Sequence, residues 1–219
     1  MYFENRTEAG RKLAKRLSGY ANRNDVIVLG VPRGGVPVAF EISQALKVPL
    51  DVFLVRKLGA PGQEELAMGA IASGGVRILD RETIEALGVS DLDIESITSK
   101  EQKELQRRER AYRGGRPPLD VHEKTVIVVD DGIATGSSMR AGIKALRQMK
   151  PARIVVAVPV APASTCGHLE REVDELVCLD TPELFYAIGQ FYADFSQVTD
   201  EEVQGLLRQS AELAARSKA

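Results

Sequence analysis

The chain has 219 residues, of which 44% are hydrophobic and 27% are charged, and its 29 basic and 31 acidic side chains leave a net charge of −2. This length and composition are typical of one globular domain, so we expect residues 1–219 to form a single unit. A nearly neutral chain has no general attraction to a phosphate backbone, which argues against nucleic acid as a partner.

No segment has the pattern of a membrane span or an export signal. The longest apolar run, Ile154–Ala163, is far shorter than the roughly 20 residues that cross a bilayer. Residues 1–12 contain no apolar signal region, so we expect a cytoplasmic protein without membrane contact. The two cysteines, Cys166 and Cys178, are expected to be reduced, and two histidines add too few ligands for a zinc site.

Short β-branched runs alternate with amphipathic stretches, a pattern that predicts a parallel α/β sheet. The first amphipathic stretch is a helix with Ala9, Leu13, Leu17 and Tyr20 on one face. Helices are also predicted over 36–46 and 137–149. Buried strands are predicted at 26–29, 52–55, 126–129, 154–158 and 176–179. The expected fold class is therefore α/β, with a Rossmann-like central parallel sheet of about five strands flanked by helices.

A β-hairpin interrupts this alternation between the second and third strands. Residues 67–72 and 76–79 flank Ser73-Gly74-Gly75, which is typical of a hairpin at the edge of a sheet. The preceding residues, Leu58 to Glu65, contain two glycines and a proline and predict a mobile loop. Residues 58–79 are thus expected to form one flexible unit.

A charged helix is predicted over 90–116, before the third core strand. Its second half, residues 100–116, carries seven basic and three acidic side chains. A solvated helix face and a contact surface for an anionic substrate or partner are both open interpretations. The last helix is expected to begin with the capping box Thr199-Asp-Glu-Glu202.

The segment with the most chemical information is Val126-Ile-Val-Val-Asp-Asp-Gly-Ile-Ala-Thr-Gly-Ser-Ser138, a strand that ends in two carboxylates and turns into a helix. Strand ends in parallel sheets open onto the binding crevice, so the amides and hydroxyls of this loop can surround a phosphate. The acceptor-only carboxylates of Asp130 and Asp131 suit the vicinal hydroxyls of a sugar. The candidate phosphate-binding residues are Gly132, Ile133, Ala134, Thr135, Gly136, Ser137 and Ser138.

All thirteen positions of this segment resemble the 5-phosphoribosyl 1-diphosphate (PRPP) motif of the type I phosphoribosyltransferases. The shared pattern is four apolar residues, two acidic residues and a small-residue loop with Thr-Gly. The dinucleotide fingerprint GxGxxG and the P-loop GxxxxGK[ST] are both absent from the sequence.

Gly30-Val-Pro-Arg-Gly-Gly35 is similar to the diphosphate-binding loop of the same family, which often has an unusual peptide that we expect near Arg33-Gly34. The resemblance implies that Arg33, Gly34 and Gly35 bind diphosphate. Read alone, a Gly-Gly after a strand is a tight strand-to-helix turn.

Two further segments agree with the family in chain order. Arg56 and Lys57 resemble a cationic pair that several members place beside the diphosphate, although two cations at a strand end are by themselves simply solvated. Residues 180–198 correspond to the hood over the nucleobase, where Phe185 and Tyr186 could stack on a heterocycle or pack into the core.

The resemblance implies Mg²⁺-dependent transfer of the 5-phosphoribosyl group from PRPP to a nucleobase or related nitrogen acceptor, with release of diphosphate. Mg²⁺ would be held mainly through PRPP, with Asp130 and Asp131 nearby. These two acids would position the ribose, and Arg33 and Lys57 would stabilise the leaving group, so the resemblance makes all four catalytic. The family commonly forms dimers, and a homodimer is implied here.

The acceptor is not assigned by these motifs. Members that use hypoxanthine or guanine carry an aspartate at the position of Ala134, and alanine resembles the adenine- and uracil-using members instead. The nearest carboxylates for general acid catalysis are Glu64 and Glu65. The charged helix is not a feature of the common salvage enzymes, which indicates a divergent member.

Two other functions compete with transfer. One is a non-catalytic PRPP-binding regulator that binds nucleic acid through the basic stretch Lys100–Arg116. Retention of Arg33 and Lys57 favours catalysis over this alternative. The other is a phosphatase, which would need a nucleophile and a set of metal ligands that the sequence does not display.

Overall fold

The main sheet of this computed structural model has five parallel strands in the order β2-β1-β6-β7-β8. The structure describes residues 1–216, without the side chains of Glu65 and Arg216. The strands are β1 Val26–Gly30, β2 Leu50–Val52, β6 Thr125–Val129, β7 Arg153–Val160 and β8 Glu175–Asp180. This arrangement confirms the predicted α/β class.

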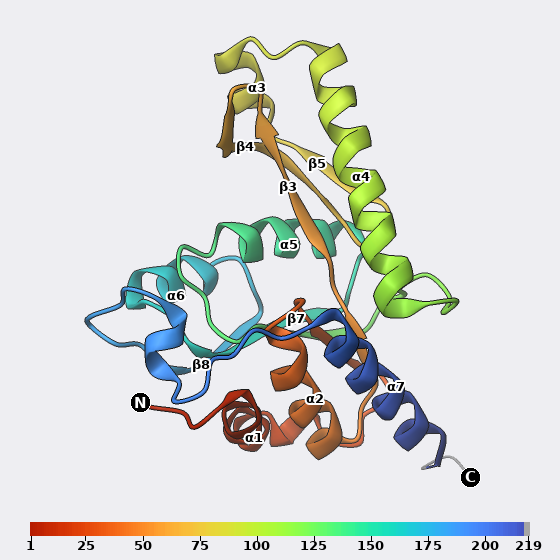
Figure 1. Ribbon diagram of the computed structural model, residues 1–219, viewed down its shortest axis with the longest axis vertical. Coiled ribbons are helices and arrows are strands. Elements are labelled where there is room, and N and C mark those ends of the chain that lie inside the picture. Colours follow the sequence, from red (N-terminus) through yellow and green to blue (C-terminus); the bar gives the residue numbers. More distant parts are fainter. Residues whose placement is uncertain (217–219) are drawn as a thin grey trace.

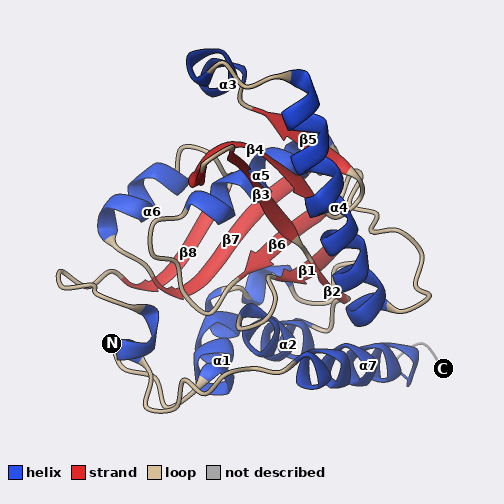
Figure 2. Ribbon diagram, turned by 45° about the horizontal axis from the view of Figure 1, so that its top comes forward, coloured by secondary structure: helices blue, strands red, loops and turns tan. Residues whose placement is uncertain are grey.

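Helices cover both faces of the sheet (Figure 2). One face packs on α1 Arg6–Arg16, α2 Gly35–Leu46 and α7 Asp200–Arg216, and the other on α5 Ser137–Gln148 and α6 Ala163–Leu169. Along β6, Ile127 and Val129 join the first core, whereas Val126 and Val128 join the second. Strand side chains alternate between faces, so one continuous apolar run fills two cores.

The predicted second strand is displaced. The strand expected at 52–55 ends at Val52, and Val55 already begins another sheet. Between them the Leu54 amide donates to Ser73 Oγ at 3.1 Å, and buried Phe53 packs with the α5 side of the core. The apolar run in the sequence extends beyond the strand because the connecting residues, Phe53 and Leu54, are as buried as the strand itself.

A second, antiparallel sheet rises from the first, in the order β3-β4-β5 (Figure 1). Its strands are β3 Val55–Ala60, β4 Gln63–Ala72 and β5 Val76–Leu79. The predicted loop over Leu58–Glu65 is therefore wrong, since only Pro61 and Gly62 lie between two strands. Proline followed by a glycine with φ of +72° is the preferred centre of a tight turn, and buried Leu58 fixes β3 against the core.

The inserted charged helix is confirmed as α4 Asp91–Arg113, capped by the Ser90 hydroxyl and preceded by α3 Arg81–Leu87. Ile94, Leu105 and Tyr112 bury its apolar stripe in the same core as β3 and β4. The capping box of α7 is also confirmed, with reciprocal hydrogen bonds between Thr199 and Glu202. Two short 3-10 helices, η1 Ser18–Tyr20 and η2 Ile188–Phe191, complete the elements of the described residues. Within residues 1–216, the helices are all too short or too polar to cross a bilayer.

Three of the basic side chains of α4 form ion pairs within the fold. Arg107 and Arg108 both pair with Glu104, and these two guanidinium groups lower the pKa of Glu104 to about 2. Arg113 forms two hydrogen bonds of 3.0 Å with Asp51 at the end of the main sheet, and donates a third to the Pro117 carbonyl. The basic side chains of α4 therefore both anchor this helix and place positive charge at the surface.

The buried Arg113–Asp51 pair gives a stability test. Arg113→Met should lower the free energy of unfolding by about 3 kcal/mol, because it leaves the Asp51 carboxylate, only 12% exposed, without its charged partner. The matched control Arg107→Met removes a guanidinium from the solvated face of the same helix and should change it by less than about 0.5 kcal/mol. Urea unfolding measures both, and equal losses would contradict this anchoring role.

Candidate active site

Two loops meet at the carboxyl ends of the neighbouring strands β1 and β6. The strands pair in register up to Gly30 and Val129, and the Val31 amide donates to the Val129 carbonyl at 2.8 Å just beyond that point. The loop after β1 leads directly into α2, and the loop after β6 leads into α5. The structure therefore brings the predicted diphosphate and sugar-phosphate loops side by side.

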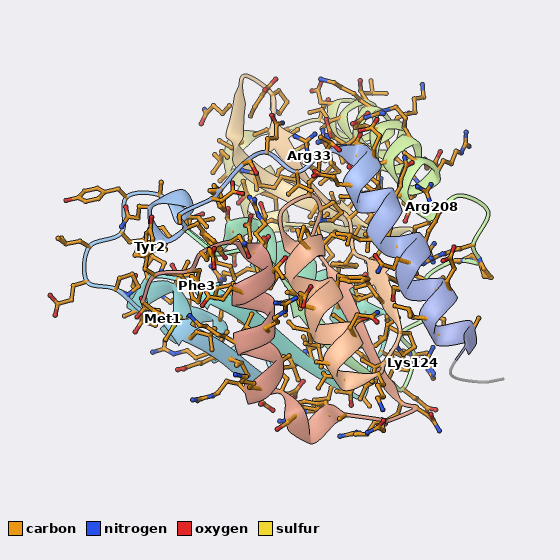
Figure 3. All side chains as sticks on the ribbon, turned by 60° about the horizontal axis from the view of Figure 1, so that its bottom comes forward. Met1, Tyr2, Phe3, Arg33, Lys124 and Arg208 are labelled. Atoms are coloured by element: carbon orange, nitrogen blue, oxygen red, sulfur yellow. The ribbon has the colours of Figure 1, made fainter. Side chains whose placement is uncertain are left out.

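Glycine is required where these loops touch. A Cβ on Gly34 would overlap the Asp131 carboxylate, and a Cβ on Gly35 would lie 2.5 Å from the Val129 carbonyl oxygen. The cis peptide bond of this loop is Pro32–Arg33, one residue before the predicted position. Arg33 itself is exposed near the start of α7, where its guanidinium lies 3.8 Å from the Asp200 carboxylate (Figure 3).

The two acidic residues have different surroundings. Asp130 Oδ1 accepts a hydrogen bond from the Asp131 amide at 2.9 Å, and Asp131 Oδ2 accepts one from Arg6 Nε at 2.8 Å. Burial of the carboxyl group, and then the negative charge of Asp131, raise the pKa of Asp130 well above its usual range. Burial also raises the pKa of Asp131, while the Arg6 guanidinium opposes that rise.

The loop over 132–138 is held at both sides. The Ile133 amide donates to the Val160 carbonyl, so the fold already uses this predicted phosphate donor. The Thr165 hydroxyl of α6 donates to the Ala134 carbonyl at 2.7 Å, and Gly136, with φ of +77°, is the N-cap residue of α5. Ala134, Thr135, Ser137 and Ser138 are exposed at this helix start, where first-turn amides have no partner within the helix.

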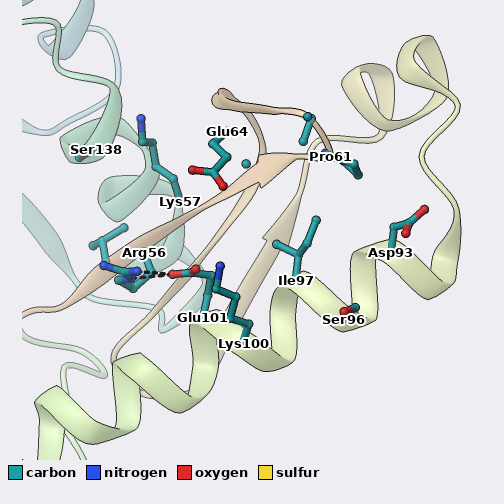
Figure 4. Close-up of a pocket in the computed structure, with 14 residues that line it drawn as sticks. Arg56, Lys57, Pro61, Glu64, Asp93, Ser96, Ile97, Lys100, Glu101 and Ser138 are labelled. Carbon is teal, nitrogen blue, oxygen red and sulfur yellow. Dashed lines mark hydrogen bonds and ion pairs between the residues drawn. The ribbon is translucent and has the colours of Figure 1, made fainter.

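The predicted cationic pair lies on β3, beside a cleft of about 610 Å³ between the β3–β4 turn and α4 (Figure 4). Arg56 points to α4, where Nε lies 2.7 Å from Glu101 Oε2, whereas Lys57 points toward Ser138. Glu64 also lines this cleft, and the side chain of Glu65 lies outside the described residues. The side chains of Arg56 and Lys57 thus point in different directions from β3 (Figure 4).

The hood residues divide between packing and exposure. Phe185 is half-buried with its ring 5.3 Å from that of Phe191, whereas Tyr186 is 84% exposed. Tyr192 is buried, and its hydroxyl donates to the Asp131 main-chain carbonyl at 2.6 Å. Phe185, Phe191 and Tyr192 therefore pack within the fold, and Tyr192 also supports the main chain of the acidic motif.

Sequence reasoning missed two neighbours of the predicted site. Arg6 reaches Asp131 from the first helix, and Glu101 reaches Arg56 from α4. Neither position carries a local pattern, because each partner is distant in the chain. Within the described residues no group of three or more His, Cys, Asp or Glu side chains could hold a metal ion.

Comparison with known proteins shows the family to which this chain is similar. A family model described as phosphoribosyl transferase domain matches residues 2–196. The "Putative phosphoribosyl transferase Rv0571c" of Mycobacterium tuberculosis is 43% identical over 205 residues, which cover 94% of this chain and 46% of that protein. The "Bifunctional protein PyrR" of Chloroflexus aurantiacus is 33% identical over 153 residues, or 65% of this chain and 72% of that protein.

A solved structure, TT1426 from Thermus thermophilus, superposes with a TM-score of 0.85 at 40% identity and covers 95% of this chain and 99% of its own. The chain spans about half the length of its mycobacterial relative. Because the family model matches most of the chain, including both loops of the site, the protein belongs to the phosphoribosyl transferase domain family.

Proposed function

We propose that this protein transfers the 5-phosphoribosyl group of PRPP to a nitrogen acceptor and releases diphosphate. The observation that supports this most strongly is the meeting of the Gly34-Gly35 loop, the Asp130–Asp131 pair and the 132–138 loop at one edge of the sheet. Parallel α/β sheets bind their ligands at this edge.

The 5-phosphate would bind at the start of α5. Its donors would be the hydroxyls of Thr135, Ser137 and Ser138 and the first-turn amides of the helix, where the helix dipole favours an anion. The Ile133 amide would not donate to the phosphate, since it is already bonded to the Val160 carbonyl, and Ile133 would instead hold the loop in place. Binding energy at this remote phosphate would fix the anomeric carbon for reaction.

The diphosphate would lie over the Gly34-Gly35 turn. The two glycines let this turn lie directly against the acidic loop, so its backbone and the exposed Arg33 guanidinium would both be close to the diphosphate. Arg56 and Lys57 would both approach from β3, and Arg56 is bonded to Glu101 in this structure. We assign the stabilisation of the leaving group mainly to Arg33 and Lys57, the two cations that the family resemblance makes catalytic.

The reaction itself would be a displacement at C1 of the ribose. A nitrogen lone pair forms the new N–C1 bond, the C1–O bond breaks, and its electron pair leaves with diphosphate. The Asp130–Asp131 pair would bind the ribose hydroxyls and favour positive charge at C1. Asp130 and Asp131 would lie near Mg²⁺, which would be held mainly by substrate oxygens and would supply positive charge for the diphosphate.

The acceptor would lie beneath the hood. Phe185 has a partly open ring for stacking, whereas Tyr186 projects into solvent and would have to move to contact a base. Alanine at position 134 offers no carboxylate for a base proton, which disfavours a 6-oxopurine acceptor. The regulator hypothesis has less support, because Arg107 and Arg108 pair with Glu104.

The first experiment incubates the protein with PRPP, Mg²⁺ and a panel of purines, pyrimidines and simple nitrogen acceptors. We expect diphosphate release in step with one nucleotide product, and loss of both when Mg²⁺ is chelated. PRPP binding without release for any acceptor would favour the regulator. Absence of PRPP binding would overturn the proposed function.

Asp131→Asn should reduce turnover about 100-fold, because it removes a charge aimed at the ribose while keeping the side-chain volume. The free energy of unfolding should change by no more than about 2 kcal/mol. The matched control Asp25→Asn lies at the opposite end of the sheet, half exposed, and should retain full turnover. Wild-type turnover by the Asp131 variant would show that the site is elsewhere.

Arg33→Ala should weaken inhibition by diphosphate about tenfold, because a charge-assisted contact to the leaving group is lost. Arg23→Ala provides a control with similar exposure, 42% against 40%, at the far end of the sheet. Inhibition constants for diphosphate measure both, and an unchanged constant in the Arg33 variant would remove this loop from the diphosphate site.

A further inference from the structure

The side chain of Arg6 is held by several contacts at the edge of the acidic motif. Its side chain is only 12% exposed, although it lies in the first turn of α1. Nε donates to Asp131 Oδ2 at 2.8 Å, one terminal nitrogen donates to the Ser196 carbonyl at 2.8 Å, and the guanidinium lies 4.0 Å from the centre of the Phe195 ring. Three contacts in three directions fix the plane of the guanidinium.

The chain segment before Arg6 is fastened to the end of the hood. The Phe3 amide donates to the Phe191 carbonyl, and the Ala193 amide donates to the Phe3 carbonyl, both at 2.8 Å. The Phe3 ring is fully buried, 5.4 Å from the Tyr192 ring. Tyr192 in turn donates its hydroxyl to the Asp131 carbonyl. Arg6 and Asp131 are therefore held by one shared framework.

Asp131 is restrained at one oxygen and at its backbone. Arg6 binds Oδ2, the Gly34 backbone packs against the carboxylate, and Tyr192 and the Asp130 carboxylate hold the main chain at its carbonyl and amide. The charged and titratable groups around this carboxylate are thus Arg6, Asp130 and Tyr192. A carboxylate has acceptor positions on both oxygens, so Oδ1 can accept a further hydroxyl while Oδ2 stays with Arg6.

We propose that Arg6 is a positioning residue that orients the Asp131 carboxylate toward a ribose hydroxyl of the phosphoribosyl donor. This inference rests on the proposed function, because it uses Asp131 as the ribose ligand. Arg6 itself does not need to touch the donor. It would act by holding the carboxylate in one rotamer, which leaves less to be ordered when the sugar binds.

The test compares three ligands by calorimetry in the presence of Mg²⁺: PRPP, ribose 5-phosphate and inorganic diphosphate. Arg6→Met keeps an unbranched side chain over Phe195 but removes the guanidinium. It should weaken binding of PRPP and ribose 5-phosphate at least about tenfold, and leave diphosphate binding unchanged, since diphosphate has no hydroxyl for Asp131. A general loss of fold would instead weaken all three ligands.

Arg11→Met is the matched control. Arg11 lies in the same helix, is 68% exposed and pairs with Glu41 away from the loops, so the substitution should leave all three affinities unchanged. Arg6→Lys should recover part of the ribose 5-phosphate affinity, because it restores the charge without the planar fork.

A double-mutant cycle separates positioning from direct contact. If Arg6 acts only through Asp131, the variant with both Arg6→Met and Asp131→Asn should bind ribose 5-phosphate no more weakly than Asp131→Asn alone. Additive losses would overturn the inference, as would wild-type affinity in Arg6→Met. Failure of the wild-type protein to bind either sugar phosphate would instead overturn the proposed function, and the inference with it.

Discussion

The approach of two loops at the ends of β1 and β6 is the constraint on which the site depends. Gly34 and Gly35 allow the first loop to lie directly against the Asp131 carboxylate and the Val129 carbonyl. Any side chain at Gly34 would separate the loops and displace the acidic motif. Burial in this region raises the pKa values of the two neighbouring carboxyl groups, Asp130 and Asp131. Such shifted pKa values are concentrated at functional sites.

The antiparallel sheet and α4 share their core with the main sheet rather than standing apart from it. Leu58 of β3, Leu105 of α4 and Val203 of α7 belong to the same hydrophobic cluster. Tyr112 of α4 donates to Asp200, the acid that also lies nearest to Arg33. Movement of α4 would therefore affect two predicted diphosphate ligands, Arg56 through Glu101 and Arg33 through Asp200.

Much of the fold was predictable because each element has its own local signal. Continuous β-branched runs marked the buried strands, and the capping box at Thr199 marked the start of α7. The second strand was misplaced because Phe53 and Leu54 are buried outside any strand. The prediction of a loop at 58–65 was wrong because Pro61 and Gly62 form a tight turn between two strands and do not interrupt the strands on either side. Arg6 was beyond reach, since only the folded chain brings it to Asp131.

The position of Arg6 also ties the site to the order in which the chain is made. Its partners Asp131 and Ser196 lie 125 and 190 positions later, so these contacts have very high sequence separation. During synthesis from the N-terminus, the two loops can form their local turns early, but the contacts that hold Arg6 on Asp131 must wait for Ser196. A nascent chain would thus carry both motifs well before it carries a completed sugar site.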